Sequence, residues 1–140
     1  MCIMSLKGFL YHWQNLEWNA FEDQLADNCE FEIVWIGMKF NKEEFSQLIQ
    51  TITEEHPWHT NNKLIDEIII EDYTISTISR LWPDDGPPDF EIIVAKWSNG
   101  KIEKGCGYSN QRLDNKLAKK WIESFKIDKK RIRIRFRNLG

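Results

Sequence analysis

The sequence predicts an α+β fold in which helices pack on one face of a curved antiparallel sheet. Apolar residues recur at three- and four-residue steps before residue 20 and again over residues 41–52, which is the spacing of amphipathic helices. Two-residue alternation dominates residues 64–108, which is the spacing of strands. The dipeptide Asn99-Gly100 stands between the last two strands and is the strongest short-range signal for a β-hairpin. Helices laid on one side of such a sheet bury the apolar surface of both.

The composition is typical of one cytoplasmic domain. The 140 residues are 41% hydrophobic and 29% charged, and this length is sufficient for one core. No apolar run approaches the ~20 residues of a membrane span, and the N-terminus lacks the pattern of a signal peptide. Cys2, Cys29 and Cys106 are far apart and form no CxxC pair. We therefore expect reduced thiols, no metal site and no cofactor.

Three helices are expected before the main run of strands. The first carries an apolar stripe at helical spacing, made by Ile3, Leu6, Leu10, Trp13 and Leu16. A short helix should cover Ala20–Ala26 and end at Asp27-Asn28, because both residues favour turns. The third should begin at Asn41, where Glu44 completes a capping box, and stop before Pro57.

The strands are expected in the order in which alternation appears. Residues 30–36 form the first, with Phe31, Ile33 and Trp35 on one face. Residues 64–71 and 74–82 form an antiparallel pair, and Arg80 shares its face with Ile78. A Pro- and Gly-rich loop over residues 83–88 leads to the Asn-Gly hairpin.

The last part of the chain is strongly basic. Residues 112–137 contain 11 Lys/Arg and 3 Asp/Glu, whereas the remainder contains 8 Lys/Arg and 19 Asp/Glu. An amphipathic helix is expected around Leu117, Trp121 and Phe125, followed by a strand whose outer face is entirely cationic. Its arginines are Arg131, Arg133, Arg135 and Arg137.

The order of elements resembles that of the nuclear transport factor 2-like superfamily, and within it the SnoaL-like domains. Three stretches carry the resemblance: the step from helix to first strand over Leu25–Glu32, the strand pair from His59 to Leu81, and the hairpin turn over Trp97–Ile102. The resemblance implies a cone-shaped domain over residues 1–112, with a pocket between the sheet and the helices. Residues 113–140 would be a helix–strand extension on that domain.

Members of this superfamily include polyketide cyclases, ketosteroid isomerases, dehydratases and epoxide hydrolases, besides proteins that serve as scaffolds. The acid that SnoaL-like cyclases carry after the hairpin turn is matched here by Gly107. The position of the ketosteroid isomerase base, after the glutamate of the first strand, is matched by Ile33, which follows Glu32. Neither activity is therefore expected from these positions.

The candidate acid/base residues are His59 and Glu32. Histidine titrates near neutral pH, so a pocket-facing His59 could transfer a proton. A carboxylate such as Glu32 could serve as a base if the pocket desolvated it. The alternative is that both side chains are solvated on the surface.

The candidate pocket residues combine aromatic rings with one cation. Rings of this kind line cavities for flat or apolar ligands, although they equally form cores. Arg80 could bind a carboxylate or enolate, or could lie on the surface with its stem over Trp82. The predicted pocket set is Trp35, Trp58, Arg80, Trp97 and Tyr108.

Three interpretations of the function remain open for this sequence. The first is a pocket protein that binds a small apolar or cyclic molecule and acts on it by acid/base chemistry. The second is a non-catalytic interaction module, with a homodimer formed through the sheet. A third and weaker interpretation is that the four tail arginines contact the phosphates of a nucleic acid. The alternative is that these arginines pair with the acidic surface of the same chain, which requires no nucleic acid.

Overall fold

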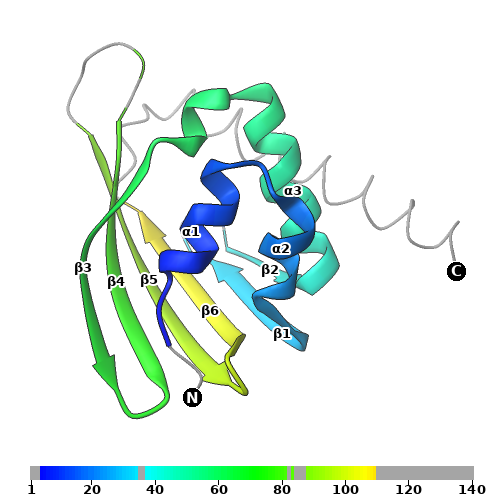
Figure 1. Ribbon diagram of the computed structural model, residues 1–140, viewed down its shortest axis with the longest axis vertical. Coiled ribbons are helices and arrows are strands. Elements are labelled where there is room, and N and C mark those ends of the chain that lie inside the picture. Colours follow the sequence, from blue (N-terminus) through cyan, green and yellow to red (C-terminus); the bar gives the residue numbers. More distant parts are fainter. Residues whose placement is uncertain (1–3, 35–36, 82, 84–87, 110–140) are drawn as a thin grey trace, which may run out of the picture.

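The computed structural model describes residues 4–34, 37–81, 83 and 88–109 (Figure 1). Trp35, Trp82 and the predicted C-terminal helix and basic strand lie outside the described residues. In the described part, helices cover one face of a six-stranded sheet, and the other face carries no described helix (Figure 1). The predicted α+β fold class is confirmed.

The sheet has the strand order β2-β1-β6-β5-β4-β3. All neighbouring strands are antiparallel except β1 and β6, which run parallel, so the sheet is mixed and not purely antiparallel as predicted. The helices are α1 (Lys7–Gln14), α2 (Trp18–Asp23), α3 (Lys42–Glu55) and the 3₁₀ helix η2 (Pro57–Thr60). The strands are β1 (Leu25–Ile33), β2 (Met38–Asn41), β3 (Asn62–Ile70), β4 (Tyr73–Arg80), β5 (Asp89–Ser98) and β6 (Lys101–Ser109).

The first strand differs from its prediction. Asp27-Asn28 does not end the second helix, because α2 already ends at Asp23 and β1 begins at Leu25. The pairing of β1 with β6 is irregular between Leu25 and Glu30, and this bulge accommodates the two turn-forming residues within the strand. The strand β2 was missed because only Phe40 of its four residues is buried, so it has no alternation to detect.

The predicted start of the third helix is confirmed. The Asn41 side chain accepts a hydrogen bond from the Glu44 backbone N–H at 2.9 Å, and the Glu44 carboxylate accepts one from the Asn41 backbone N–H at 3.0 Å. This capping box satisfies two N–H groups that the first turn leaves without helical partners. The predicted hairpin is confirmed as well, because Asn99 and Gly100 both have positive φ, at 52° and 77°.

Stacked aromatic rings hold the sheet to the helices. Phe31 on β1 stacks on Phe45 of α3 with ring centroids 4.0 Å apart, and Phe9 and Phe21 extend the cluster to α1 and α2. The Phe31 ring also lies over Gly105 of β6, where a Cβ would overlap it. The ring of Phe31 on the neighbouring strand β1 therefore covers the flat surface that Gly105 leaves on β6.

Candidate functional site

A row of polar side chains crosses three strands on the helix-facing side of the sheet. Asn62 of β3 pairs with Arg80 of β4, which pairs in turn with Asp89 of β5. Directly paired residues project to the same face, so the three side chains lie side by side. All three are buried, with exposed fractions of 4%, 4% and 2%. A buried polar row of this kind on the inner face is the first component of the candidate site.

Arg80 is held in this row by several contacts. Its Nε donates to Asn62 Oδ1 at 2.8 Å, and one terminal nitrogen donates to Glu91 Oε2 at 3.2 Å. Its guanidinium carbon lies 5.3 Å from the centroid of the Trp13 ring, which is within the range of a cation–π contact. The predicted face of Arg80 is therefore correct. The alternative of a surface arginine is wrong, because the side chain is interior.

Asp89 is the unusual member of the row. Its two carboxyl oxygens are buried, and neither has a hydrogen-bond partner among the residues that the structure describes. A carboxyl group removed from water without compensating hydrogen bonds costs several kcal/mol on the general scale. Such a group is rare in stable cores and marks sites where a further partner is expected.

His59 lies beside this row in η2. It is buried, its ring centroid is 4.3 Å from that of Trp58, and its backbone carbonyl accepts a hydrogen bond from Asn62 Nδ2 at 2.8 Å. Burial lowers the pKa of His59, and the nearby Arg80 cation and His56 act in the same direction, so that together they bring it to about 2. The imidazole is therefore neutral near neutral pH and offers a polar ring to the site without a charge.

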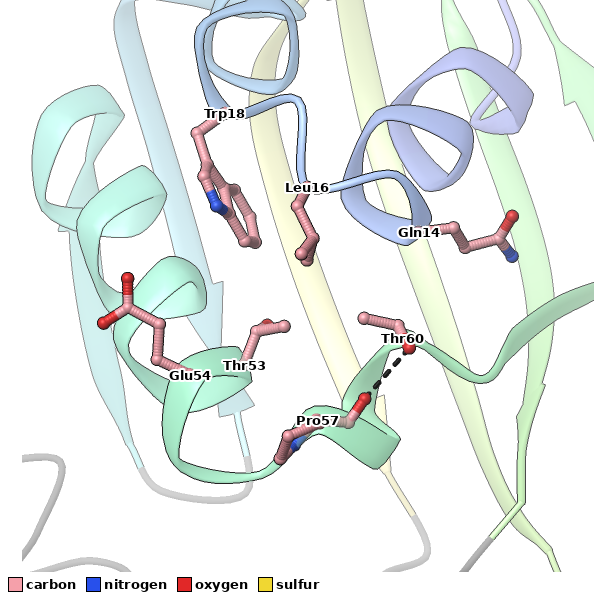
Figure 2. A pocket seen from close by; sticks show the side chains of 7 residues that line it. All are labelled: Gln14, Leu16, Trp18, Thr53, Glu54, Pro57 and Thr60. Atoms are coloured by element: carbon pink, nitrogen blue, oxygen red, sulfur yellow. Dashed lines mark hydrogen bonds between the residues drawn. The ribbon is translucent and has the colours of Figure 1, made fainter.

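A groove opens at the ends of the helices and forms the second component (Figure 2). It has a volume of about 380 Å³ and lies between the α1–α2 connection and the end of α3 with η2. Trp18 and Leu16 project into it side by side, opposite Thr53 and Pro57 (Figure 2). Its described lining residues are Gln14, Leu16, Trp18, Thr53, Glu54, Pro57 and Thr60.

Two hydrogen bonds connect the groove to the buried row. Gln14 Nε2 donates to the Asn62 backbone carbonyl, and Trp13 Nε1 donates to Thr53 Oγ1 at 3.0 Å. The same Trp13 ring lies under Arg80. Contacts from Thr53 through Trp13 thus link the lining of the groove to the Arg80 guanidinium.

The structure separates the other predicted site residues. Glu32 and Tyr108 are on the opposite face of the sheet, and Glu32 Oε1 lies 4.0 Å from Cys106 Sγ there. Trp97 is buried in the core, where its indole N–H donates to Thr74 Oγ1 at 2.9 Å. Trp58 is half-buried beside His59 and is not among the described lining residues of the groove, so its pocket role stays a prediction. His59 and Glu32 are therefore not brought together.

Sequence reasoning missed Asn62, Asp89 and Glu91. Asp89 directly follows the Pro- and Gly-rich loop, where an aspartate indicates a turn, and Asn62 lies in a run of polar residues that also indicates a loop. Only the cross-strand register reveals that both face Arg80. The spacing of Asp89 and Glu91, two residues apart on one strand, was the available signal that they share a face.

Neither a metal site nor a membrane span is found in the described residues. No group of three or more His, Cys, Asp or Glu side chains there is arranged to hold a metal ion. No helix among them combines the length and the apolar character that crossing a bilayer requires.

Comparison with known proteins identifies the fold. No protein-family profile and no curated protein sequence matches this chain. Among solved structures, IdmH, a putative polyketide cyclase from Streptomyces antibioticus, is 10% identical with a TM-score of 0.61 over 75% of this chain and 88% of that one. A putative ketosteroid isomerase from Kribbella flavida is 8% identical with a TM-score of 0.61 over 77% and 76% of the two chains. An LEH-like epoxide hydrolase from M. tuberculosis is 15% identical with a TM-score of 0.58 over 75% and 79%.

These similarities confirm the predicted resemblance at the level of the fold. The chain has the nuclear transport factor 2-like α+β fold, in which helices pack on one face of a curved sheet. Proteins named as a putative ketosteroid isomerase, a putative polyketide cyclase and an epoxide hydrolase share this architecture, so the fold alone does not specify a function. The reaction, if any, has to be argued from the residues of the site.

Proposed function

We propose that this protein binds a small apolar or cyclic molecule between the helices and the sheet and acts on it by acid/base chemistry at Asp89. The supporting observation is the buried Asp89 carboxyl group, whose oxygens have no hydrogen-bond partner among the described residues. A substrate that donated a hydrogen bond or a proton to this group would supply the missing partner.

The neighbours of Asp89 complete the proposed chemistry. Asp89 would accept a proton from the substrate or from a water molecule, and Arg80 would stabilise the negative charge that develops. Asn62 and Glu91 hold the guanidinium through the hydrogen bonds described above and act as positioning residues. His59, being neutral, would orient the substrate or a water by hydrogen bonding, so the predicted catalytic pair of His59 and Glu32 is replaced by Asp89 and Arg80.

The first test replaces Asp89 with asparagine, which keeps the shape and removes the ionisable group. We expect Asp89→Asn to raise the stability of the free protein by about 1–2 kcal/mol, because an uncompensated buried carboxyl group is removed. The same variant should lose the thermal stabilisation that wild-type ligands produce, which is about 2.7 kcal/mol at 100 times the dissociation constant. The measurement is a thermal melt against a panel of cyclic and apolar carbonyl compounds.

The matched control is Asp66→Asn, because Asp66 is an exposed aspartate on β3. We expect it to change stability by less than about 0.5 kcal/mol and to leave ligand shifts intact. A marked loss of stability in Asp89→Asn would mean that Asp89 has a structural partner, and the assignment of Asp89 as the base would then be abandoned.

A second candidate role, self-association through the sheet, is supported by the outer face. Apolar side chains there are exposed by 43% to 54%, which is unusual for one contiguous area of a monomer. The residues are Ile68, Ile70, Phe90, Ile92 and Tyr108. The proposed homodimer would bury them against a second copy. Phosphate binding by Arg131, Arg133, Arg135 and Arg137 remains a prediction, and those residues lie outside the described part.

The homodimer predicts a particle of twice the mass of one chain in light scattering after size exclusion. Ile92→Lys should convert it to a monomer, because a buried lysine without a partner opposes association. Tyr11→Lys is the control, since Tyr11 is an equally exposed apolar residue on α1, away from the outer face. A wild-type protein of single-chain mass at micromolar concentration would exclude the homodimer.

A further inference from the structure

Trp18 lines two hollows on the helical side of the protein. One is the helix-end groove of Figure 2, and the other, of about 230 Å³, lies between α2 and α3. The described lining residues of the second hollow are Trp18, Asn19, Glu22, Glu43, Ser46, Gln47 and Gln50. None of these residues, nor any of those that line the groove, belongs to the buried row of Asn62, Arg80 and Asp89.

The charged residues that line both hollows are all carboxylates. Glu54 lines the groove, and Glu22 and Glu43 line the second hollow, with no Lys or Arg among the described lining residues. The pKa of Glu22 is raised by burial and by the neighbouring Glu43 carboxylate. Lys42 is close enough to Glu22 to lower that pKa, but its Nζ is already bonded to Asp27 Oδ1 at 3.1 Å. The surface around Trp18 therefore carries an excess of negative charge.

The end of α3 adds to this negative field. Helix C-termini carry a partial negative charge and usually have Lys, Arg or His in the last turn. The last turn of α3 instead contains Glu54 and Glu55 and no basic residue. This arrangement is unfavourable for the free helix, and a cation bound in the groove would compensate for it.

The groove supplies an apolar and aromatic lining as well. Leu16 is 55% exposed and holds a positive φ of 58°, a backbone conformation that non-glycine residues rarely adopt. Figure 2 shows its side chain next to the Trp18 ring, with Glu54 on the Trp18 side of the groove. A groove lined by an aromatic ring, aliphatic side chains and a carboxylate combines the groups that attract alkylammonium ions, through cation–π attraction and burial of their methyl groups.

We propose that the helix-end groove is a binding site for a small organic cation that carries an alkyl-substituted ammonium group. Trp18 and Leu16 would contact the alkyl groups, and Glu54 with the C-terminus of α3 would neutralise the charge. Organic anions are disfavoured by the same field, because no lining cation could pair with them. The inference concerns the second component of the candidate site and does not require acid/base chemistry at Asp89, because neither Asp89 nor Arg80 lines the groove.

The experiment uses the full chain and two probes of nearly equal shape. Choline carries a trimethylammonium group, and 3,3-dimethylbutan-1-ol has the same outline with a neutral carbon at its centre. Binding is followed by the indole N–H signals in ¹H–¹⁵N correlation spectra, with the Trp18 signal assigned from a Trp18→Phe variant. We expect choline to shift the Trp18 signal in a saturable manner and to bind about tenfold more tightly than the neutral analogue. Equal affinities for the two probes, or no shift at Trp18, would overturn the proposal.

Two variants with matched charge locate the site. Glu54→Gln should weaken choline binding about three- to tenfold, whereas Glu55→Gln removes the same charge from the adjacent position, which does not line the groove, and should have a much smaller effect. Trp18→Leu should abolish saturable binding. If that variant does not fold, the comparison of the two glutamate variants tests the location of the site. Equal losses of choline affinity in both variants would show that Glu54 forms no specific binding site in the groove. Asp89→Asn should bind choline as the wild type does, so a failure of the acid/base proposal and a failure of the cation site are distinguishable.

Discussion

Replacing Arg80 with methionine is expected to destabilise the protein by about 3–5 kcal/mol. The substitution leaves the Glu91 carboxylate, which is bonded to Arg80 at 3.2 Å and is 19% exposed, without its cation. Removal of one partner from a buried ion pair costs this much because the remaining charge is desolvated and unpaired. Equilibrium unfolding in urea measures the loss.

Two further variants test the origin of that cost. Arg80→Met combined with Glu91→Gln should recover a substantial part of the stability, because the double variant no longer contains the orphaned Glu91 charge. Lys96→Met is the matched control, since the Lys96–Glu103 pair is 3.8 Å long and both side chains are about a third exposed. Its loss should stay below about 1 kcal/mol. If Arg80→Met cost no more than the control, the polar row would not be a stabilised, preorganised site.

Acid is expected to destabilise the protein through His59. The pKa of His59 is lowered from 6.5 to about 2 by burial and by the Arg80 cation, so the unfolded chain binds a proton more readily than the folded chain. The contribution of the neutral ring is fully present above pH 6.5 and is lost as the pH falls from 6.5 toward 2. The loss is about 1.4 kcal/mol per pH unit, or roughly 2–3 kcal/mol between pH 6.5 and 4.5.

A difference measurement separates this effect from the titration of carboxylates. His59→Gln should flatten the stability profile over that pH window relative to the wild type, because the carboxylates are the same in both proteins and only the His59 titration is removed. The measurement is the free energy of unfolding at half-unit pH steps. Parallel profiles for the wild type and His59→Gln would show that His59 accepts a proton in the folded state without cost.

Local signals in the sequence predicted most of the architecture. The Asn41–Glu44 capping box and the Asn99-Gly100 turn each encode their geometry within a few residues, and both are confirmed. Alternation over β3 to β6 predicted the strands and placed Arg80 on the same face as Ile78, whereas only the structure shows that this face meets the helices. The short strand β2 and the early start of β1 could not be predicted, because both depend on pairing with distant partners.

The candidate site could be predicted only in part. His59, Trp58 and Arg80 were selected by residue type, and the structure places all three at one end of the inner face. Glu32 and Tyr108 were selected by the same reasoning and lie on the outer face. Residue type does not indicate which of two faces a strand presents to the helices, and a one-residue difference in register exchanges them.

The sequence by itself thus determined the fold class, the hairpin, the helix cap and the set of residue types available for chemistry. Only the tertiary structure decided that Asn62, Arg80 and Asp89 form one buried row, because their proximity comes from the register of three strands that are separated along the chain. It likewise decided that Trp18, Leu16 and Glu54 share a groove, since two helix ends must meet to form it. Caps and turns are determined by interactions between neighbouring residues in the sequence. A site is instead assembled by packing between segments that are far apart in the sequence.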